Sequence, residues 1–153
     1  MYKILMVCHG NICRSPMAEF VLRDMLKKRG IDNVLVESAA TSTEEIGNGV
    51  HYGTKRILNG LGIDCSFKTA RQMTRHDGEE YDLLLGMDSR NILNMKRMTD
   101  SSKHDRIHRL LDYSERPGDI ADPWYTGDFD RTYNDVLEGC TALLEYLLRE
   151  GII

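Results

Sequence analysis

The segment from Lys3 to Pro16 (K-I-L-M-V-C-H-G-N-I-C-R-S-P) constrains the fold more than any other part of the chain. Lys3 to Val7 predicts a short apolar strand of the kind buried at the centre of a parallel sheet. Ser15-Pro16 predicts a helix start with Ser15 as N-cap, and Met17 to Lys28 predicts the helix itself, with Glu19 in its first turn. A strand that delivers a loop of backbone N–H groups to a helix N-terminus favours anion binding. We therefore expect a phosphate-binding loop here.

Strands and helices alternate along the rest of the chain. This alternation predicts an α/β fold: a three-layer sandwich with a four-stranded parallel sheet, helices on both faces, and the phosphate-binding loop after the first strand. Ser38 to Gly49 is small and polar and predicts a surface loop, whereas Asp112 to Asp128 is long enough to be a functional loop. Ligands of parallel sheets bind at the C-terminal ends of the strands, so these segments are expected to share one rim with the Cys8 loop and Met87-Asp88. The other predicted strands are Val34–Glu37, Tyr81–Met87 and Arg106–Leu111, and the other predicted helices are His51–Leu61, Ser89–Met98 and Phe129–Arg149.

Composition excludes several classes of protein. The chain has 153 residues, which fits one domain over 1–153, and its net charge of −4 provides no basic surface for nucleic acid. Its four cysteines lack the spacing of a disulfide framework or a zinc site, and its apolar runs are shorter than a membrane span. We expect a cytoplasmic, monomeric enzyme that needs no metal or cofactor and contacts no membrane.

Cys8 and Arg14 have the spacing C-x5-R, and Ser15 follows at once. A thiolate near a helix N-terminus and a guanidinium has a lowered pKa, which makes it a nucleophile at neutral pH. Arginine also offers a planar fork that matches phosphoryl oxygens. Gly10 and Asn11 tolerate the positive φ that a tight anion loop needs. The alternative is a buried core cysteine beside a surface arginine, but the strand before and the helix after favour a nucleophile.

The stretch C-H-G-N-I-C-R-S-P-M-A-E, from Cys8 to Glu19, resembles the signature of the low-molecular-weight protein tyrosine phosphatases. The resemblance covers essentially the whole chain, and it implies an enzyme that uses no metal. Its other matching points are Ser38, Ala70-Arg71-Gln72, Met87-Asp88 and Asp122-Pro123.

The resemblance implies a role for each residue of the loop. Cys8 attacks phosphorus to give a phosphocysteine that water then hydrolyses, and Arg14 clamps the phosphoryl oxygens. Ser15 donates to the thiolate and assists its departure, while Asn11, left-handed and held by Ser38, keeps the loop in shape. We expect the remaining loop residues to surround the phosphate; they are His9, Gly10, Ile12 and Cys13. His9 is also expected to shape the rim of the cleft.

Asp122 begins D-P-W-Y in the long loop and matches the family's general-acid segment. Expelling a tyrosyl phenolate, whose parent phenol has a pKa of about 10, benefits from a carboxylic acid near the leaving oxygen. The alternative for Asp122 is a capping or solvated aspartate. Trp124 would form a flat wall against the phosphotyrosine ring, unless it is an ordinary half-buried core tryptophan, and Tyr125 is a weaker candidate beside it.

Two further residues have alternative roles that the sequence leaves open. Cys13 could trap an oxidised Cys8 as a disulfide, or it could be a small packing residue, as we expect for Cys65 and Cys140. Asp88 is expected to bond the Arg14 guanidinium or position the loop, or else to cap the helix that begins at Ser89.

The chain departs from the family pattern at two positions. Lys68 stands where many members have a histidine that buttresses the nucleophile loop through the Ser15 position, so the resemblance does not carry that support over to this chain. Glu44, near Glu45, stands where some members place an aromatic wall. One side of the cleft would then be acidic, which weakens ring stacking and favours basic peptides over acidic ones.

Three alternatives remain beside a phosphotyrosine phosphatase. An arsenate reductase of this fold needs two cysteines after the third strand, but the segment 83–106 has none and Gly86 stands where a cysteine often precedes Met-Asp. A protein-arginine phosphatase carries threonine where this chain has Ile12. A phosphate-binding module without turnover would not need Cys8, Arg14 and Asp122 together. We therefore predict hydrolysis of phosphotyrosine in proteins, and of aryl phosphates, with inorganic phosphate as product.

Overall fold

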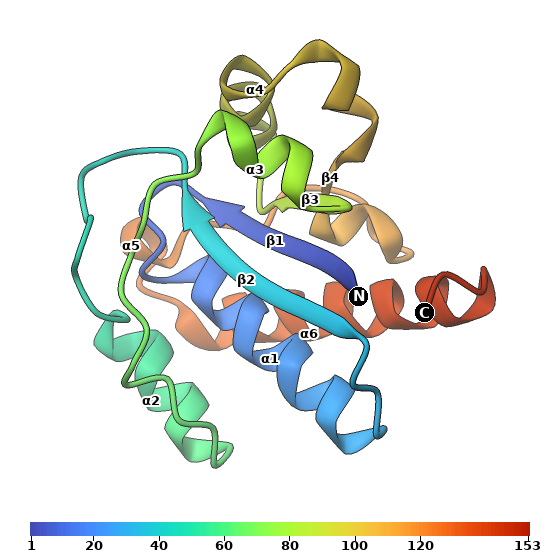
Figure 1. The fold of residues 1–153 in the computed structure, drawn as a ribbon. Helices are drawn as coiled ribbons and strands as arrows, with labels where there is room; N and C mark the ends of the chain where they lie inside the picture. The colour runs from blue at the N-terminus through green and yellow to red at the C-terminus, as the bar shows by residue number, and fades with distance from the viewer.

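Four parallel strands form the sheet at the centre of the protein, as the computed structural model of residues 1–153 shows (Figure 1). Their order is β2-β1-β3-β4, so the chain leaves β1 for one neighbour and later returns to pair on its other side. Right-handed crossovers in opposite directions then place helices on both faces. The strands are β1 (Tyr2–Cys8), β2 (Val34–Ala40), β3 (Leu83–Gly86) and β4 (Ile107–Arg109).

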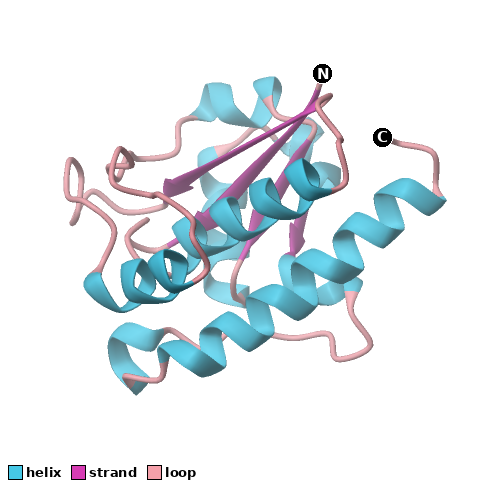
Figure 2. Cartoon of the chain, turned by 90° about the horizontal axis from the view of Figure 1, so that it is seen from below, coloured by secondary structure: helices cyan, strands magenta, loops and turns pink.

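Helices cover the sheet on both sides, which confirms the predicted three-layer sandwich. The long helices α1 and α6 lie against one face, and α3 and α4 lie beyond the other (Figures 1 and 2). None of the helices has the length and apolar character needed to span a bilayer. The helices are α1 (Arg14–Lys28), α2 (Tyr52–Gly60), α3 (Arg75–Glu80), α4 (Ser89–Met98), α5 (Pro123–Thr126) and α6 (Phe129–Arg149), with 3₁₀ turns at η1 (Ser101–Arg106) and η2 (Leu110–Tyr113).

Strand β1 separates the two hydrophobic cores. Ile4, Met6 and Cys8 point to the core shared with α1 and α6, while Leu5 and Val7 point to the smaller core under α4. This two-residue alternation is the pleat of a strand that is buried on both faces. Cys8 is the last residue of this alternation. Its side chain therefore lies at the C-terminal end of the sheet, on the face that α1 covers.

Helix α1 begins earlier than the sequence suggests. Its first residue is Arg14 and its N-cap is Cys13, so the expectation that Ser15 caps this helix was wrong. Pro16 is compatible with this start, because the first turn of a helix needs no donor from its backbone nitrogen. Glu19 consequently lies beyond the first turn, although it was expected within it, and it is only 2% exposed.

Strand β2 is longer than predicted. It pairs with β1 up to Ala40, opposite Cys8, so Ser38 and its two successors are buried strand residues, although a surface loop was expected from Ser38 onward. Small side chains let this strand end continue beneath the phosphate loop. The fourth strand is shorter than predicted, because Leu110 and Leu111 turn into η2. The predicted third strand is likewise longer than β3.

Gly86, the last residue of β3, permits a close approach of α4. A Cβ atom built there would lie 2.8 Å from Ile92 Cδ1, 3.1 Å from Asn91 Cβ and 3.1 Å from Met95 Sδ. Any larger residue would therefore require the Ile92 and Met95 side chains to move or α4 to shift away from the sheet. This contact positions the helix whose N-terminus reaches the site.

Candidate active site

The C-terminal ends of the strands meet at one rim, and a pocket of about 110 Å³ opens there. The phosphate loop, the long loop after β4 and the loop after β2 all contribute to it, as the topology predicted. Most of the expected site residues lie in its wall, and Glu45 joins them. The lining residues are Cys8, His9, Gly10, Ile12, Cys13, Arg14, Glu44, Glu45, Asp122, Trp124 and Tyr125.

The loop after β1 curls around the Cys8 sulfur. Asn11 has φ 58°, the only positive φ of a residue other than glycine, and its backbone N–H donates to Cys8 Sγ at 3.3 Å. The backbone N–H groups of Gly10, Ile12 and Cys13 have no backbone acceptor. A concave row of such donors at a helix N-terminus stabilises an anion.

Four residues that were expected in the site do not line the pocket: Asn11, Ser15, Ser38 and Asp88. Asn11 is hydrogen-bonded to both serines. Its Nδ2 donates to Ser15 Oγ at 2.8 Å and to Ser38 Oγ at 2.9 Å. Ser15 Oγ in turn lies 3.0 Å from Cys8 Sγ. The left-handed conformation of Asn11 is therefore held by hydrogen bonds, as expected, and Ser15 contacts the sulfur from within the first helical turn.

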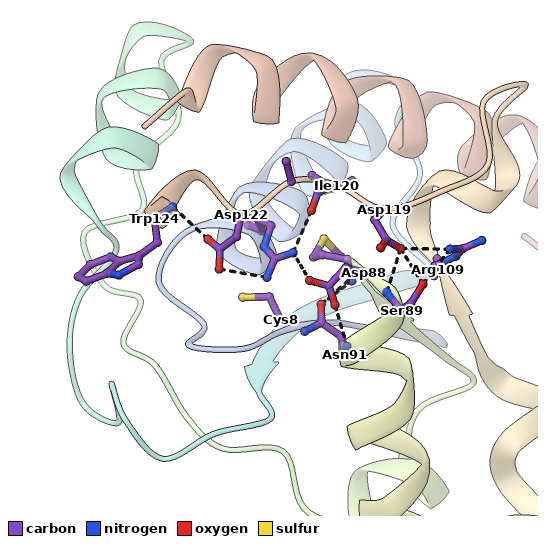
Figure 3. A network of polar contacts seen from close by, with 12 residues as sticks. Cys8, Asp88, Ser89, Asn91, Arg109, Asp119, Ile120, Asp122 and Trp124 are labelled. Atoms are coloured by element: carbon purple, nitrogen blue, oxygen red, sulfur yellow. Dashed lines mark hydrogen bonds and ion pairs between the residues drawn. The ribbon is translucent and has the colours of Figure 1, made fainter. Parts of the chain in front are cut away.

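Arg14 is only 2% exposed and is held by acceptors from two other segments (Figure 3). Its Nη1 donates to Asp88 Oδ2 at 2.7 Å and to the carbonyl of Ile120 at 2.9 Å, and its Nη2 lies 3.4 Å from Asp122 Oδ2. Burial lowers the pKa of this guanidinium, but the negative charge at Cys8 and the two carboxylates outweigh burial and raise it overall. The buried Nε has no partner, so the arginine has an unused donor.

Asp88 has both of the roles that the sequence left open. One oxygen binds Arg14, and the other accepts from the backbone N–H of Asn91 at 2.8 Å, which caps α4 (Figure 3). Asn91 Oδ1 completes the capping box by accepting from the backbone N–H of Asp88 at 3.1 Å. The same carboxylate thus connects the arginine to a helix N-terminus.

Asp122 caps the short helix α5, and it also faces the pocket. Its Oδ1 accepts from the backbone N–H of Trp124 at 3.0 Å, while Oδ2 is directed toward Arg14. The capping role is therefore confirmed. It does not exclude a role of Asp122 in the pocket, because the cap uses only one of its two carboxylate oxygens.

Trp124 is not a core residue. It is 59% exposed, and its ring meets His51 edge-on at a centroid distance of 5.8 Å. His51 stacks on Phe129 at 5.0 Å and its backbone N–H donates to the carbonyl of Ile12 at 2.9 Å. The tryptophan wall is thus supported by a histidine that also contacts the phosphate loop. Tyr125, next to it, is more exposed still.

The loop that carries Asp122 is anchored at its base by Arg109. Arg109 Nη1 lies 3.1 Å from Asp119 Oδ1, and the same oxygen accepts from the Ser89 hydroxyl at 2.9 Å (Figure 3). The next residue is Ile120, whose carbonyl binds Arg14. Neither Arg109 nor Asp119 could be identified from the sequence, because only the fold brings β4, α4 and this loop together.

Cys13 is buried and packs inside the protein, and its disulfide with an oxidised Cys8 stays a prediction. It contacts a small cluster with Ile12, Ala70 and Phe129, and its carbonyl accepts from Thr54 Oγ1 at 3.0 Å. Burial, and next the charge of the neighbouring Cys8, raise the pKa of the Cys13 thiol to about 12. The other two cysteines are likewise buried, so the predicted packing role is confirmed for Cys65 and Cys140.

The opposite wall of the pocket is acidic. Glu44 is exposed and its Oε2 lies 3.0 Å from His9 Nε2, while Glu45 accepts from Asn48 Nδ2 at 2.6 Å. Both glutamates line the pocket. Nowhere in the protein are three or more His, Cys, Asp or Glu side chains arranged to hold a metal ion.

A cysteine in an anion-binding loop, with a buried arginine beside it and a carboxylate across the pocket, is the arrangement of the cysteine-dependent phosphatases. The sequence profile of the family described as low molecular weight phosphotyrosine protein phosphatase matches residues 3–152. The chain belongs to this family and is a protein-tyrosine phosphatase enzyme.

Individual relatives agree with this assignment over their full length. The low molecular weight protein-tyrosine-phosphatase YfkJ of Bacillus subtilis is 39% identical over 98% of both chains, and its crystal structure matches with a TM-score of 0.94 over 98% of this chain and 96% of the other. PtpA of Staphylococcus aureus is 34% identical over 99% of this chain and 97% of its own. The phosphatase SP-PTP of Streptococcus pyogenes is 41% identical, with a TM-score of 0.80 over 97% and 93% of the two chains.

Proposed function

We propose that this protein-tyrosine phosphatase removes phosphate from phosphotyrosine side chains of proteins through a phosphocysteine intermediate on Cys8. The observation that carries the proposal is the position of Cys8 Sγ. It lies at the bottom of the pocket, 3.3 Å from the Asn11 backbone N–H and 3.0 Å from Ser15 Oγ, under the free donors of the loop. A thiolate so placed lies directly beneath a bound phosphoryl group.

Arg14 and the loop amides bind the phosphate dianion. The unpartnered Nε of Arg14 and its Nη2 are the donors available for two phosphoryl oxygens. Asp88 and the Ile120 carbonyl hold Nη1 and so fix the plane of the guanidinium before substrate arrives. This preorganisation leaves the fork ready for a bidentate contact.

In the first chemical step the Cys8 thiolate attacks phosphorus and the bond from phosphorus to the tyrosyl oxygen breaks. The leaving oxygen takes a proton from Asp122, so a neutral tyrosine departs and Asp122 is left ionised. The proton resides on Oδ2, because Oδ1 is occupied by the cap of α5. Phosphate binding to Arg14 replaces the 3.4 Å contact between Arg14 and Asp122, which frees the carboxyl group for this role.

In the second step a water attacks the phosphocysteine. Asp122 accepts a proton from that water, phosphorus forms a bond to its oxygen, and the bond to Cys8 breaks to give inorganic phosphate and the thiolate. The Ser15 hydroxyl, 3.0 Å away, stabilises the departing sulfur. The carboxylic acid is thereby restored for the next cycle.

The walls of the pocket select the substrate. Trp124, with Tyr125 beside it, offers an aromatic face to the phosphotyrosine ring. Ile12 lies in the lining where threonine marks the arginine phosphatases, which favours an aromatic over a guanidinium phosphate. Glu44 and Glu45 on the other wall favour basic residues next to the phosphotyrosine.

We further propose that the whole chain, residues 1–153, acts as one monomeric domain in the cytoplasm without nucleic acid or membrane partners. Four unpaired cysteines, all buried, fit a reducing compartment. The net charge of −4 provides no field for a polyanionic partner.

The test is hydrolysis of p-nitrophenyl phosphate and a phosphotyrosine peptide with EDTA present, for the parent and Cys8→Ser. Activity in the parent and none in the variant is the expected result. If a folded, reduced parent is inactive on both, the tyrosine assignment fails, and phosphoarginine and arsenate are then assayed. Binding of phosphate without turnover of any of these would identify a binding module instead.

A further inference from the structure

Two cations surround the buried carboxylate of Glu19, which Ser38 and Asn11 connect to the phosphate loop. Glu19, 2% exposed on α1, receives Arg23 Nη2 at 2.7 Å on one oxygen. Its other oxygen lies 3.6 Å from Lys68 Nζ. The same ammonium donates to the backbone carbonyl of Ser38 at 2.9 Å. Lys68 stands in the loop between α2 and α3, at the position where the family's usual histidine is missing.

The hydrogen bonds between this cluster and Cys8 have a definite direction. The backbone N–H of Arg71 donates to Asn11 Oδ1 at 3.2 Å, which fixes the side-chain amide with its nitrogen toward the two serines. An amide nitrogen donates and never accepts. Ser15 Oγ and Ser38 Oγ, at 2.8 and 2.9 Å, are therefore both acceptors from Asn11.

Each serine hydroxyl has a single proton left to give. The Ser38 proton goes to Glu19 Oε1 at 2.5 Å, and the Ser15 proton goes to Cys8 Sγ at 3.0 Å. The network thus has an anion at each end, Glu19 and the Cys8 thiolate, with Asn11 as the donor between them. It requires Glu19 to be an acceptor, and a carboxylate that is 2% exposed stays ionised only beside cations.

We propose that Lys68 is a positioning residue for the nucleophile. Together with Arg23 it balances the charge of Glu19, and by binding the Ser38 carbonyl it maintains the hydrogen-bond direction in which Ser15 donates to the Cys8 thiolate. This inference rests on the proposed role of Cys8. Lys68 touches neither the substrate nor the sulfur, and it acts through Glu19, Ser38 and Asn11.

A lysine does this over a wider pH range than a histidine, whose ordinary pKa is near 6.5. The charged groups that face Lys68 are Glu19, Arg23 and Arg71. Burial lowers the pKa of Lys68, Glu19 opposes that shift, and the two arginines add to it. The ammonium therefore loses its proton earlier than an exposed lysine in alkaline solution.

The experiment measures how fast iodoacetamide alkylates Cys8 as a function of pH, in substrate-free protein. We expect Lys68→Met to move the midpoint of this profile upward by about one pH unit, because the thiolate loses an aligned donor. With p-nitrophenyl phosphate we expect kcat to fall about tenfold and KM to change little. Lys68→Arg, which retains the charge, should keep the parent midpoint. Lys28→Met, which neutralises an exposed lysine on the same helix as Glu19, is the matched control and should change neither quantity.

An unchanged midpoint in a folded Lys68→Met protein would overturn the proposal. The double variant Glu19→Gln with Lys68→Met separates charge compensation from packing, because the glutamine still offers a carbonyl oxygen to Ser38 without needing a cation. We expect it to recover the parent midpoint, and this variant decides the question if Lys68→Met does not fold. A folded double variant whose midpoint stays displaced would show that Lys68 does not act through Glu19. Alkylation needs no turnover, so an inactive parent with a normal profile would contradict the proposed function and leave this inference standing.

Discussion

The active site has two sides that differ in burial. On one side Asn11, Ser15 and Ser38 are almost wholly buried, and each is joined to the next by hydrogen bonds. On the other side Trp124 is 59% and Tyr125 84% exposed, on a helix of only four residues. The buried side contacts the sulfur, and the exposed side faces the part of the substrate that varies.

This difference follows from what each side has to do. Phosphorus chemistry is the same for every substrate, and a positive φ at Asn11 persists only where its surroundings over-determine it. A leaving group, by contrast, arrives with a protein attached, so its wall has to be open to solvent. Five predictions test whether the buried side controls the chemical steps and the exposed side controls the choice of substrate.

Replacing the nucleophile should have the largest effect. Cys8→Ser should abolish turnover, because a serine hydroxyl in this loop is not ionised at neutral pH, while phosphate affinity should remain. Steady-state rates and calorimetric titration with inorganic phosphate measure the two quantities. Residual turnover near the parent rate would exclude the covalent mechanism.

The two cysteines of the loop should differ strongly in reactivity. The pKa of Cys13 is raised to about 12, so below that pH the group is a neutral thiol, and its thiolate fraction falls as pH falls. At pH 7 about one Cys13 in 10⁵ is ionised, and we expect iodoacetamide to label Cys8 alone. Peptide mass mapping after labelling checks this, and labelling of Cys13 should increase with rising pH. Equal labelling of both at pH 7 would show that the buried side is open to solvent.

Asp122→Ala should slow hydrolysis by about 10²–10⁴ when the leaving group is poor, and much less when it is activated. Rates with phenyl phosphate and p-nitrophenyl phosphate make the comparison. Asp130→Ala, an exposed aspartate on α6, serves as control and should leave both rates unchanged. An equal loss on both substrates would remove Asp122 from the general-acid role.

Trp124→Ala should raise KM for a phosphotyrosine peptide by about tenfold, the equivalent of an aromatic contact of roughly 1.4 kcal/mol, with a small effect on kcat. The side chain is exposed, so thermal stability should change little. A loss in kcat without a change in KM would mean that the tryptophan positions Asp122 and does not bind the ring.

Glu44→Gln should have the smallest effect. Its exposed carboxylate should change the ratio of kcat/KM between a basic and an acidic phosphotyrosine peptide by a few-fold, and this change should weaken with added salt. The ratio measured at low and high ionic strength tests it. If this ratio does not respond to the substitution, residues other than Glu44 determine the preference between basic and acidic peptides.

The sequence was sufficient where the information is local. The strand, loop and helix around Cys8 are contiguous, and Asp122-Pro123 is a recognisable motif at the expected sheet edge, so both could be predicted. The burial of Ser38 was missed because β2 ends in small residues that read as a loop. Glu19 was placed in the wrong turn because the N-cap was predicted at Ser15, whereas the helix is capped at Cys13.

The supports of the site could not be predicted, because their partners are distant in the chain. Lys68 reaches Ser38 across 30 residues and Arg14 reaches the Ile120 carbonyl across 106. Those contacts depend on strand register and helix rotation, which no short motif specifies. Lys68 was noted from the sequence only as a departure from the family's histidine, and the structure places its ammonium on the Ser38 carbonyl and 3.6 Å from Glu19.

Gly86 has a consequence for how this chain can evolve. A side chain at this position, such as that of cysteine, would place its Cβ atom 2.8 Å from Ile92 Cδ1 and 3.1 Å from Met95 Sδ. A side chain added at position 86 would therefore press on the helix whose cap holds Arg14, unless the Ile92 and Met95 side chains move aside. A substitution at Gly86 is therefore better tolerated after smaller residues have been acquired on α4, so the order of the substitutions matters as much as their identity.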